Sequence, residues 1–227
     1  MKDSKIIVFS PHPDDETFGC GGTIAKRLCE GFEVSVVLMT DGRHAYSEPF
    51  GIVADPTPEE LKKIRKTEEE RAMRILGLRD ENLVFLDFED GTLEQNREEA
   101  EKEVVRILVE HRPTEVYNVH EGDFHPDHRA ASRIVENAIK KASIHTTQCQ
   151  YSISSRYGRL GMLAALLLSR IKQNVSYVDI SDFLPLKEKA MKEFRSQIST
   201  MSERQERPVV RNLQRFMRDK EVFFVDK

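Results

Sequence analysis

The sequence predicts a three-layer α/β domain in which helices cover both faces of a mostly parallel, twisted sheet. Short, nearly continuous apolar and β-branched runs recur along the chain, as is typical of strands buried on both faces. Amphipathic segments of helical period lie between them. Strand and helix alternate four times, which indicates right-handed βαβ crossovers. With 227 residues and 39% apolar side chains, the chain can bury one continuous core, so we expect a single domain over residues 1–227.

The elements follow from these patterns in order. The expected strands, rich in Ile, Val, Leu and Phe, are 5–10, 34–40, 82–88, 115–119 and 148–153. The expected helices are 23–30, 59–76, 94–111 and 129–141. Apolar residues form one stripe on the longer helices, for example Ala100, Val104, Ile107 and Leu108. The rest is less regular, with a strand at 175–180, a helix at 186–201 and a closing strand at 222–225, so that residues 200–227 form a C-terminal helix and strand extension.

Two segments interrupt this scheme. Residues 44–58 form a long connection with three prolines and two aromatic residues, Tyr46 and Phe50, which we expect to be exposed. Because the connection follows the C-terminal end of a strand, it is a candidate functional loop. In residues 204–220, arginines recur at helical spacing opposite apolar residues, at Arg207, Arg211, Arg215 and Arg218. This pattern favours a solvated helix face, with an anion-recognising patch as the alternative.

Composition excludes several classes of protein. The formal net charge is −4, so no global positive field attracts nucleic acid. Three widely spaced cysteines indicate neither a disulfide scaffold nor a structural zinc knuckle. We find no signal peptide, which leads us to expect a cytoplasmic protein. The longest apolar run, residues 160–168, is too short to span a bilayer and is expected to pack in a homo-oligomer interface.

The first group of reactive side chains follows the first strand, in the motif Pro-His-Pro-Asp-Asp-Glu at residues 11–16. Crowded carboxylates raise one another's pKa unless a cation holds them, so a metal site is the simplest explanation. His12 and Asp15 are three residues apart across a turn and can converge on one ion, which leaves Asp14 free as a base. A capping turn at the start of a helix is the alternative.

A second group, in the motif His-Glu-Gly-Asp-Phe-His-Pro-Asp-His at residues 120–128, follows the fourth strand. In a doubly wound sheet of order 3-2-1-4-5, the first and fourth strands are neighbours, and ligands bind where their outgoing loops diverge. We therefore expect one metal site at the C-terminal edge of these two strands. His12, Asp15 and either His125 or His128 would supply two imidazoles and one carboxylate.

This ligand set with an open fourth position is typical of catalytic zinc, although it can also bind Fe²⁺. A zinc-bound water of lowered pKa, with Asp14 as general base, predicts the hydrolysis of a carbonyl derivative. The alternatives are a metal-dependent phosphoesterase and a non-enzymatic metal-binding module. A dinucleotide site is disfavoured because Ile24 stands at the third glycine position of the Gly-x-Gly-x-x-Gly fingerprint of such sites. We expect the glycines at 19–22 instead to let the helix approach the metal loop closely.

Four motifs together resemble the LmbE-like, PIG-L family of zinc-dependent de-N-acetylases. They are Pro-His-Pro-Asp-Asp-Glu at 11–16, Gly-Gly-Thr at 21–23, Thr-Asp-Gly at 40–42 and His-Pro-Asp-His at 125–128. The resemblance covers roughly residues 5–200. It implies a Rossmann-like fold and removal of an acetyl group from an N-acetylglucosamine-type sugar, often a small-molecule conjugate.

The resemblance also implies residue roles. The metal ligands would be His12, Asp15 and His128. Asp14 would be the general base, and His125, oriented by Asp127, would stabilise the oxyanion and donate a proton.

A helical Arg-x-x-Glu pair and a later Ser-Gln resemble the family as well. Arg65 and Glu68 lie on the apolar stripe of their helix, so Arg65 is expected to bind substrate, to support the metal loop or to form a structural pair. Ser196-Gln197 is expected to pack or to position substrate. Phe124 stands where several relatives carry a polar residue, which leaves oxyanion stabilisation to the metal and His125.

Overall fold

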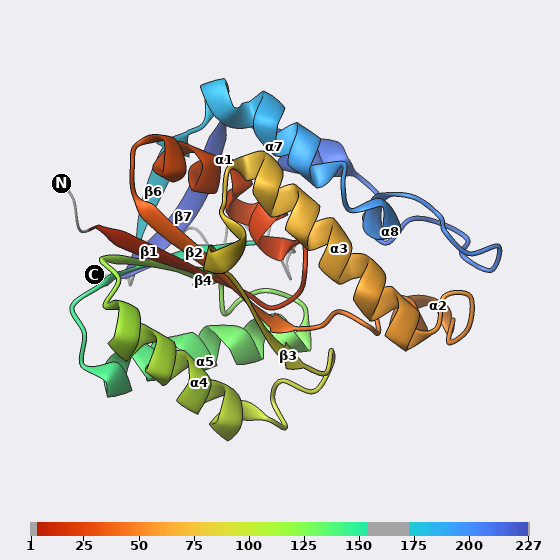
Figure 1. Cartoon of the computed structure of the whole chain (residues 1–227), viewed down its shortest axis with the longest axis horizontal. Coiled ribbons are helices and arrows are strands. Elements are labelled where there is room, and N and C mark those ends of the chain that lie inside the picture. Colours follow the sequence, from red (N-terminus) through yellow and green to blue (C-terminus); the bar gives the residue numbers. More distant parts are fainter. Residues whose placement is uncertain (1–3, 154–172, 227) are drawn as a thin grey trace.

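The computed structural model describes residues 4–153 and 173–226 and shows the expected three-layer α/β architecture (Figure 1). Its sheet has the order β3-β2-β1-β4-β5-β7-β6. The strands are β1 (Lys5–Ser10), β2 (Glu33–Thr40), β3 (Leu83–Phe88), β4 (Glu115–Val119), β5 (Thr147–Tyr151), β6 (Gln173–Asp179) and β7 (Lys220–Asp226). The first five pair in parallel, and β7 pairs antiparallel with both β5 and β6. The predicted order of the first five strands is therefore confirmed.

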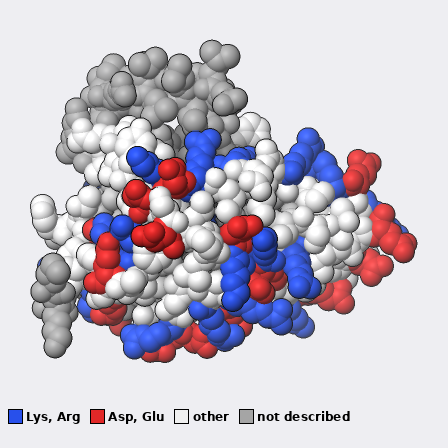
Figure 2. Space-filling model, turned by 90° about the horizontal axis from the view of Figure 1, so that it is seen from above, with Lys and Arg blue, Asp and Glu red and all other residues white. Residues whose placement is uncertain are grey.

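Helices cover both faces of the sheet. One face carries α4 (Arg97–His111) and α5 (Pro126–Ala142), and the other carries α1 (Asp15–Cys29), α3 (Pro58–Leu76) and α7 (Leu184–Met191) (Figure 1). The short elements are α2 (Ser47–Phe50), α8 (Arg195–Ile198) and the 3₁₀ turns η1 (Asp80–Asn82), η2 (Ser181–Phe183) and η3 (Leu213–Phe216). No helix among the described residues is long and apolar enough to cross a membrane. Basic and acidic side chains are interspersed on the face shown in Figure 2.

Helix α1 begins at Asp15, eight residues before the predicted start at residue 23. Its glycine-rich middle hides the helix from sequence reasoning, and the helix is kinked at Cys20. The Glu221 carboxylate of β7 accepts hydrogen bonds from the backbone N–H groups of Gly22 and Thr23 at 3.0 and 2.7 Å. A side chain about 200 positions away therefore caps the second half of the helix, which local sequence could not reveal.

The glycines of α1 make room for other elements rather than for the metal loop, so that expectation is wrong. A Cβ atom on Gly19 would overlap the ring of Tyr151, and one on Gly22 would overlap Ile180. A Cβ on Gly21 would meet its nearest neighbours at 3.6 Å, which is an ordinary van der Waals distance.

Gly19→Ala is therefore expected to lower the free energy of unfolding by about 1–3 kcal/mol, because the added methyl group overpacks the core. Gly21→Ala is the matched control in the same helix and should leave stability unchanged or raise it by up to about 1 kcal/mol. Urea unfolding of both variants measures the difference. Equal effects of the two substitutions would refute the steric explanation.

Two C-terminal predictions are wrong. The expected helix 186–201 is broken between α7 and α8, because the buried ring of Phe194 turns into the core 5.8 Å from the ring of Phe18. The expected helix over 204–220 is an irregular segment of turns and bends that contains the 3₁₀ turn η3. Its internal hydrogen bonds are confined to short turns, such as the one that Gln205 N–H donates to the Ser202 carbonyl, and Val210 donates its N–H to the Gln197 carbonyl at 2.9 Å.

The connection 44–58 is anchored in the structure at Tyr46, although its residues 53–55 are exposed. Tyr46, expected to be exposed, is buried at 1% and donates its hydroxyl hydrogen to the Ser196 carbonyl at 2.6 Å. It forms a small core with Ile52 and Leu61, against which Val209 packs. Phe50 is half-buried. The apolar run 160–168, predicted to lie in an oligomer interface, lies outside the described residues.

Candidate metal centre and active site

Three donor atoms converge where the loops after β1 and β4 meet. His12 Nδ1 lies 3.0 Å from Asp15 Oδ2 and 3.2 Å from His128 Nε2. The remaining pair, His128 Nε2 and Asp15 Oδ2, is 3.0 Å apart. All three side chains are buried. Parallel pairing of β1 with β4 brings these residues together from positions 116 apart in the chain.

The spacing of these donors fits a small tetrahedral ion. Bonds of about 2.0 Å from a tetrahedral zinc ion place neighbouring donors about 3.3 Å apart, close to the separations of 3.0–3.2 Å found here. Two other groups, His12–His125–His128 and His12–Asp90–Asp127, have donors within 4.8 Å. Both also depend on His12, and the second consists of carboxylates on the opposite ring nitrogen, where histidine ligands are usually supported rather than bound to metal.

Carboxylates support the far nitrogen of each histidine. His12 Nε2 lies 3.1 Å from Asp90 Oδ1 and 3.4 Å from Asp127 Oδ2. His128 Nδ1 lies 3.3 Å from Asp123 Oδ1. The atoms are close enough to form ion pairs, but their geometry is not that of hydrogen bonds. Such carboxylate–histidine pairs fix the orientation of a metal-binding imidazole.

Sequence reasoning missed Asp90 and gave Asp123 no role. Asp90 follows β3, just as His12 and His120 follow β1 and β4, so its place at the end of a strand was an available signal. Asp123 also accepts the Ile153 N–H at 2.9 Å.

Charges in the cluster are strongly coupled. Burial acts to raise the pKa of Asp15, but His128 and His12 outweigh it and hold the pKa well below its usual range. Burial acts to lower the pKa of His128, yet Asp15 and Asp123 raise it to about 9. The pKa of His12 is likewise raised, mainly by Asp90 against burial. The surrounding carboxylates therefore favour a positive charge at the position where the three donor atoms meet.

Asp14 sits beside this cluster in a strained conformation. Its φ of 129° lies in the region that L-residues rarely adopt. Its Oδ2 lies 3.2 Å from the Arg65 Nη2 atom. Burial raises the pKa of the Asp14 carboxyl to about 8, although Arg65 opposes the shift. Perturbed carboxyls in a cleft are candidate proton acceptors.

His125 faces the cluster from the start of α5. Its ring makes an edge contact with His12, with centroids 4.7 Å apart. Burial, followed by the charges of His12 and His128, lowers the pKa of His125 to about 4. Asp127, expected to orient His125, directs its carboxylate elsewhere: Oδ2 lies near His12 and accepts the Gly91 N–H at 2.7 Å.

A cavity of about 630 Å³ opens over these residues. Its floor includes His12, Asp14 and His125, and one wall comes from the connection 44–58. Another wall comes from residues 209–212, 215 and 216 of the C-terminal segment. Part of the donor cluster, including His12 and Asp15, is thus accessible to a small molecule.

Residues 7–139 match the sequence profile of the PIG-L family, described as GlcNAc-PI de-N-acetylase. This match spans more than half of the chain. The chain belongs to the PIG-L family. Relatives of the chain are named deacetylases, so its enzyme class is that of the amidohydrolases that act on N-acetyl sugars.

Two PIG-L relatives and one solved structure illustrate the similarity. A diacetylchitobiose deacetylase of Thermococcus kodakarensis is 31% identical over 85% of this chain and 70% of its own length. A probable N-acetyl-α-D-glucosaminyl L-malate deacetylase 2 of Bacillus cereus is 31% identical over 60% of this chain and 61% of its own. The N,N′-diacetylchitobiose deacetylase of Pyrococcus horikoshii superposes with a TM-score of 0.72 at 26% identity, covering 98% of this chain and 83% of that one.

Arg65 and Glu68, the two charged residues on the apolar stripe of α3, contact different partners. Arg65 is buried and donates to the carbonyl oxygens of Gly42 at 2.9 Å and Pro13 at 2.6 Å, in addition to its ion pair with Asp14. Glu68 instead accepts the N–H and hydroxyl of Ser196 at 2.8 and 2.6 Å. Arg65 therefore holds the loop that carries Asp14, while Glu68 fixes α8 against α3.

Behind the metal loop, α3 buries a second carboxyl, that of Glu69. Its two oxygens lack a hydrogen-bond partner among the described residues. Burial, and then the charge of Glu16, raise the pKa of Glu69 well above its ordinary value. The folded protein therefore keeps a proton on this group at a pH where the unfolded chain has lost it.

Glu69→Gln is expected to stabilise the PIG-L domain more at pH 8 than at pH 5. The wild type loses stability as pH rises from the unfolded pKa towards the raised folded pKa, and glutamine removes that loss. Thermal unfolding at the two pH values measures the gain, and half-buried Glu70→Gln in the same helix is the control. An equal gain at both pH values would contradict the prediction.

Proposed function

We propose that this protein is a zinc-dependent hydrolase that removes the acetyl group from an N-acetylglucosamine-type sugar or sugar conjugate. The observation that carries the proposal is the set of three donor atoms of His12, Asp15 and His128, 3.0–3.2 Å apart beneath an open cavity. The names of the relatives support the choice of an N-acetylated sugar as substrate.

The residues present fit a divalent metal. His12, Asp15 and His128 would hold it, and Asp90, Asp127 and Asp123 would orient the two imidazoles. Zinc suits two imidazoles and one carboxylate, and Fe²⁺ suits the same set. When bound, the ion supplies a Lewis acid that polarises a carbonyl and lowers the pKa of water.

Asp14 takes the proton from the attacking water in this proposal. Its carboxylate lines the cavity beside the three donors, so it can accept that proton and pass it to the leaving amine. Arg65 acts as a positioning residue that orients Asp14 through their ion pair. Because Arg65 also lines the cavity, a direct contact with the sugar remains part of the proposal.

His125 stabilises the negative charge that develops on the acetyl oxygen. Its Nδ1 accepts the Asp127 N–H at 3.2 Å, so the neutral ring carries its proton on Nε2. A neutral ring agrees with the lowered pKa of about 4. The Nε2–H group is therefore the donor that replaces the polar side chain missing at Phe124. Asp127 serves the reaction through His12, whose Nε2 it contacts.

A release assay tests the proposal. The purified protein is incubated with N-acetylglucosamine, diacetylchitobiose and N-acetylglucosamine glycosides, and with p-nitrophenyl phosphate beside them. We expect acetate from at least one sugar and no phosphate. Phosphate release without acetate would indicate a phosphoesterase, and release of neither product would favour a non-enzymatic metal-binding module.

A further inference from the structure

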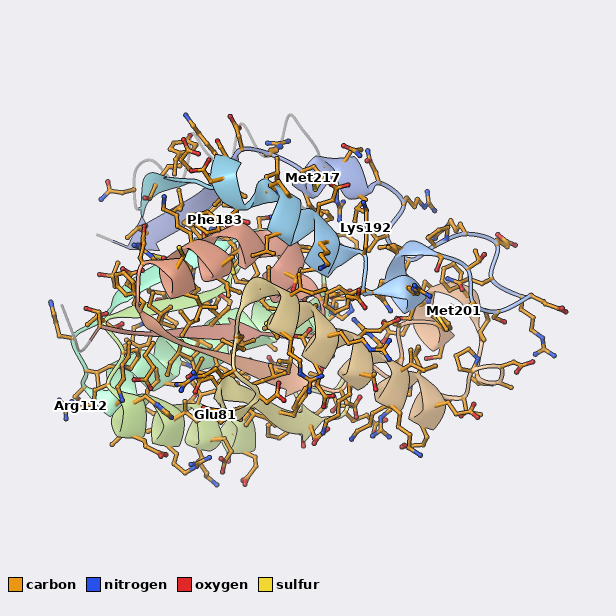
Figure 3. The ribbon with its side chains drawn as sticks, turned by 45° about the horizontal axis from the view of Figure 1, so that its top comes forward. Glu81, Arg112, Phe183, Lys192, Met201 and Met217 are labelled. Carbon is orange, nitrogen blue, oxygen red and sulfur yellow. The ribbon has the colours of Figure 1, made fainter. Side chains whose placement is uncertain are left out.

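The wall of the cavity that lies outside the family match carries two arginines, Arg211 and Arg215. They belong to the C-terminal segment 201–219, in which Figure 3 labels Met201 and Met217. This segment holds five arginines and three acidic residues in a chain of net charge −4. Because the floor of the cavity supplies the catalytic groups, the wall is the part that can distinguish substrates.

These arginines lack the carboxylate partner that several other arginines of the described chain have. Arginines such as Arg27, Arg74 and Arg133 lie within 4.0 Å of a carboxylate. Neither Arg211 nor Arg215 has an ion-pair partner among the described residues, although both face a cavity. Although Arg215 is exposed, crowding by neighbouring atoms lowers the pKa of its guanidinium, and the more distant charge of Asp123 offsets only part of this shift. An unpaired, partly desolvated cation of this kind is stabilised by an incoming anion.

The segment is anchored on both sides of the two arginines. Before Arg211, Val210 is hydrogen-bonded to the Gln197 carbonyl at 2.9 Å. After Arg215, the Phe216 ring stacks on Phe18 with centroids 4.9 Å apart. The Arg215 guanidinium lies 4.4 Å from the centroid of that same Phe216 ring. The two cations are therefore held at the cavity wall rather than on a freely solvated arm.

We propose that Arg211 and Arg215 bind an oxyanionic group, a carboxylate or a phosphate, on the part of the substrate that points away from the acetamide. The guanidinium fork matches the oxygens of both groups. The inference rests on the proposed deacetylase function and narrows its substrate class to acidic N-acetylglucosamine conjugates.

Three synthetic glycosides of N-acetylglucosamine test this inference. The carboxymethyl and carbamoylmethyl glycosides have nearly the same shape and differ in charge, and the 2-phosphoethyl glycoside supplies the other oxyanion. The test variant is Arg211→Gln/Arg215→Gln. The control is Arg204→Gln/Arg218→Gln, which removes the same charge from the same segment outside the cavity lining.

We expect the unmodified protein to prefer at least one acidic glycoside over the amide by roughly tenfold or more in kcat/KM, as loss of charge-assisted hydrogen bonds predicts. The test variant should lose that preference through KM while keeping its kcat for the amide, and the control should keep the preference. The ratio between the carboxylate and the phosphate identifies the oxyanion. An equal kcat/KM for charged and neutral glycosides, or a preference that survives in the test variant, would overturn the inference and leave the deacetylase function intact.

Dissociation constants give a second readout that does not depend on turnover. Calorimetric titration of the Asp14→Asn protein with the same glycosides should show the same preference for charge, and its loss when Arg211 and Arg215 are also replaced. If no glycoside releases acetate, the proposed function fails, and these dissociation constants still decide whether the wall binds an oxyanion.

Discussion

Replacing His12 and His128 together by alanine is expected to remove the metal from the protein. The two imidazoles supply two of the three donor atoms that lie 3.0–3.2 Å apart, and Asp15 alone cannot hold the ion. Loss of a supporting residue around a metal ligand already costs about 10–100-fold in affinity, so loss of two ligands should cost more. Elemental analysis of protein purified without added metal should find about one zinc per wild-type chain and almost none in the variant.

His145→Ala provides a matched control, because the exposed His145 precedes β5 and so lies at the opposite end of the parallel strands from the cluster. Its metal content should equal that of the wild type. Asp90→Asn should lie between the two, since Asp90 contacts His12 without joining the three donors. Full zinc content in the His12→Ala/His128→Ala protein would show that the ion is bound elsewhere.

Asp14→Asn is expected to abolish acetate release while the metal stays bound. Asparagine keeps the shape of the side chain and removes the proton acceptor, which typically costs on the order of 10²–10⁴ in rate. Steady-state acetate release and elemental analysis on the same preparation separate the two effects.

Asp87 also has a positive φ, of 57°, and lies outside the cavity lining, so Asp87→Asn controls for the backbone effect of the substitution. It should leave the rate unchanged. A fully active Asp14→Asn protein would show that another group takes the proton.

Much of the fold follows from local patterns. Continuous β-branched runs and amphipathic helices predicted the order of the first five strands, and that order brings His12 beside His128. Such patterns work where an element's own residues decide its conformation. The parallel pairing of β1 and β4 then fixes which loops meet.

Long-range contacts explain what local patterns missed. The early start of α1 depends on Glu221, and the burial of Tyr46 depends on Ser196, each more than a hundred residues away. The arginines have helical spacing, yet Val210 donates its N–H to the Gln197 carbonyl and the irregular segment lines the cavity. Spacing alone favoured a solvated helix face. Only the position of these arginines at the cavity wall supports the alternative of an anion-recognising patch.

The site was predictable in part for a similar reason. The motifs that contain His12, Asp15 and His128 follow strands directly, so their proximity follows from topology. Asp90 and Asp123 support the histidines across loops, and no spacing rule connects them to those rings. Arg65 stood on the correct face of its helix, but only the folded chain shows that its partner is Asp14 rather than Glu68.

The central claim is that a metal held by His12, Asp15 and His128 drives the removal of an acetyl group from a sugar amide. Its most direct test is acetate release by protein stripped with a chelator and then titrated with Zn²⁺, with Fe²⁺ titrated in parallel under anaerobic conditions. The account predicts that acetate release is lost on stripping and returns in proportion to added metal until about one ion per chain is bound. Acetate release that is unchanged after the metal has been removed would contradict it.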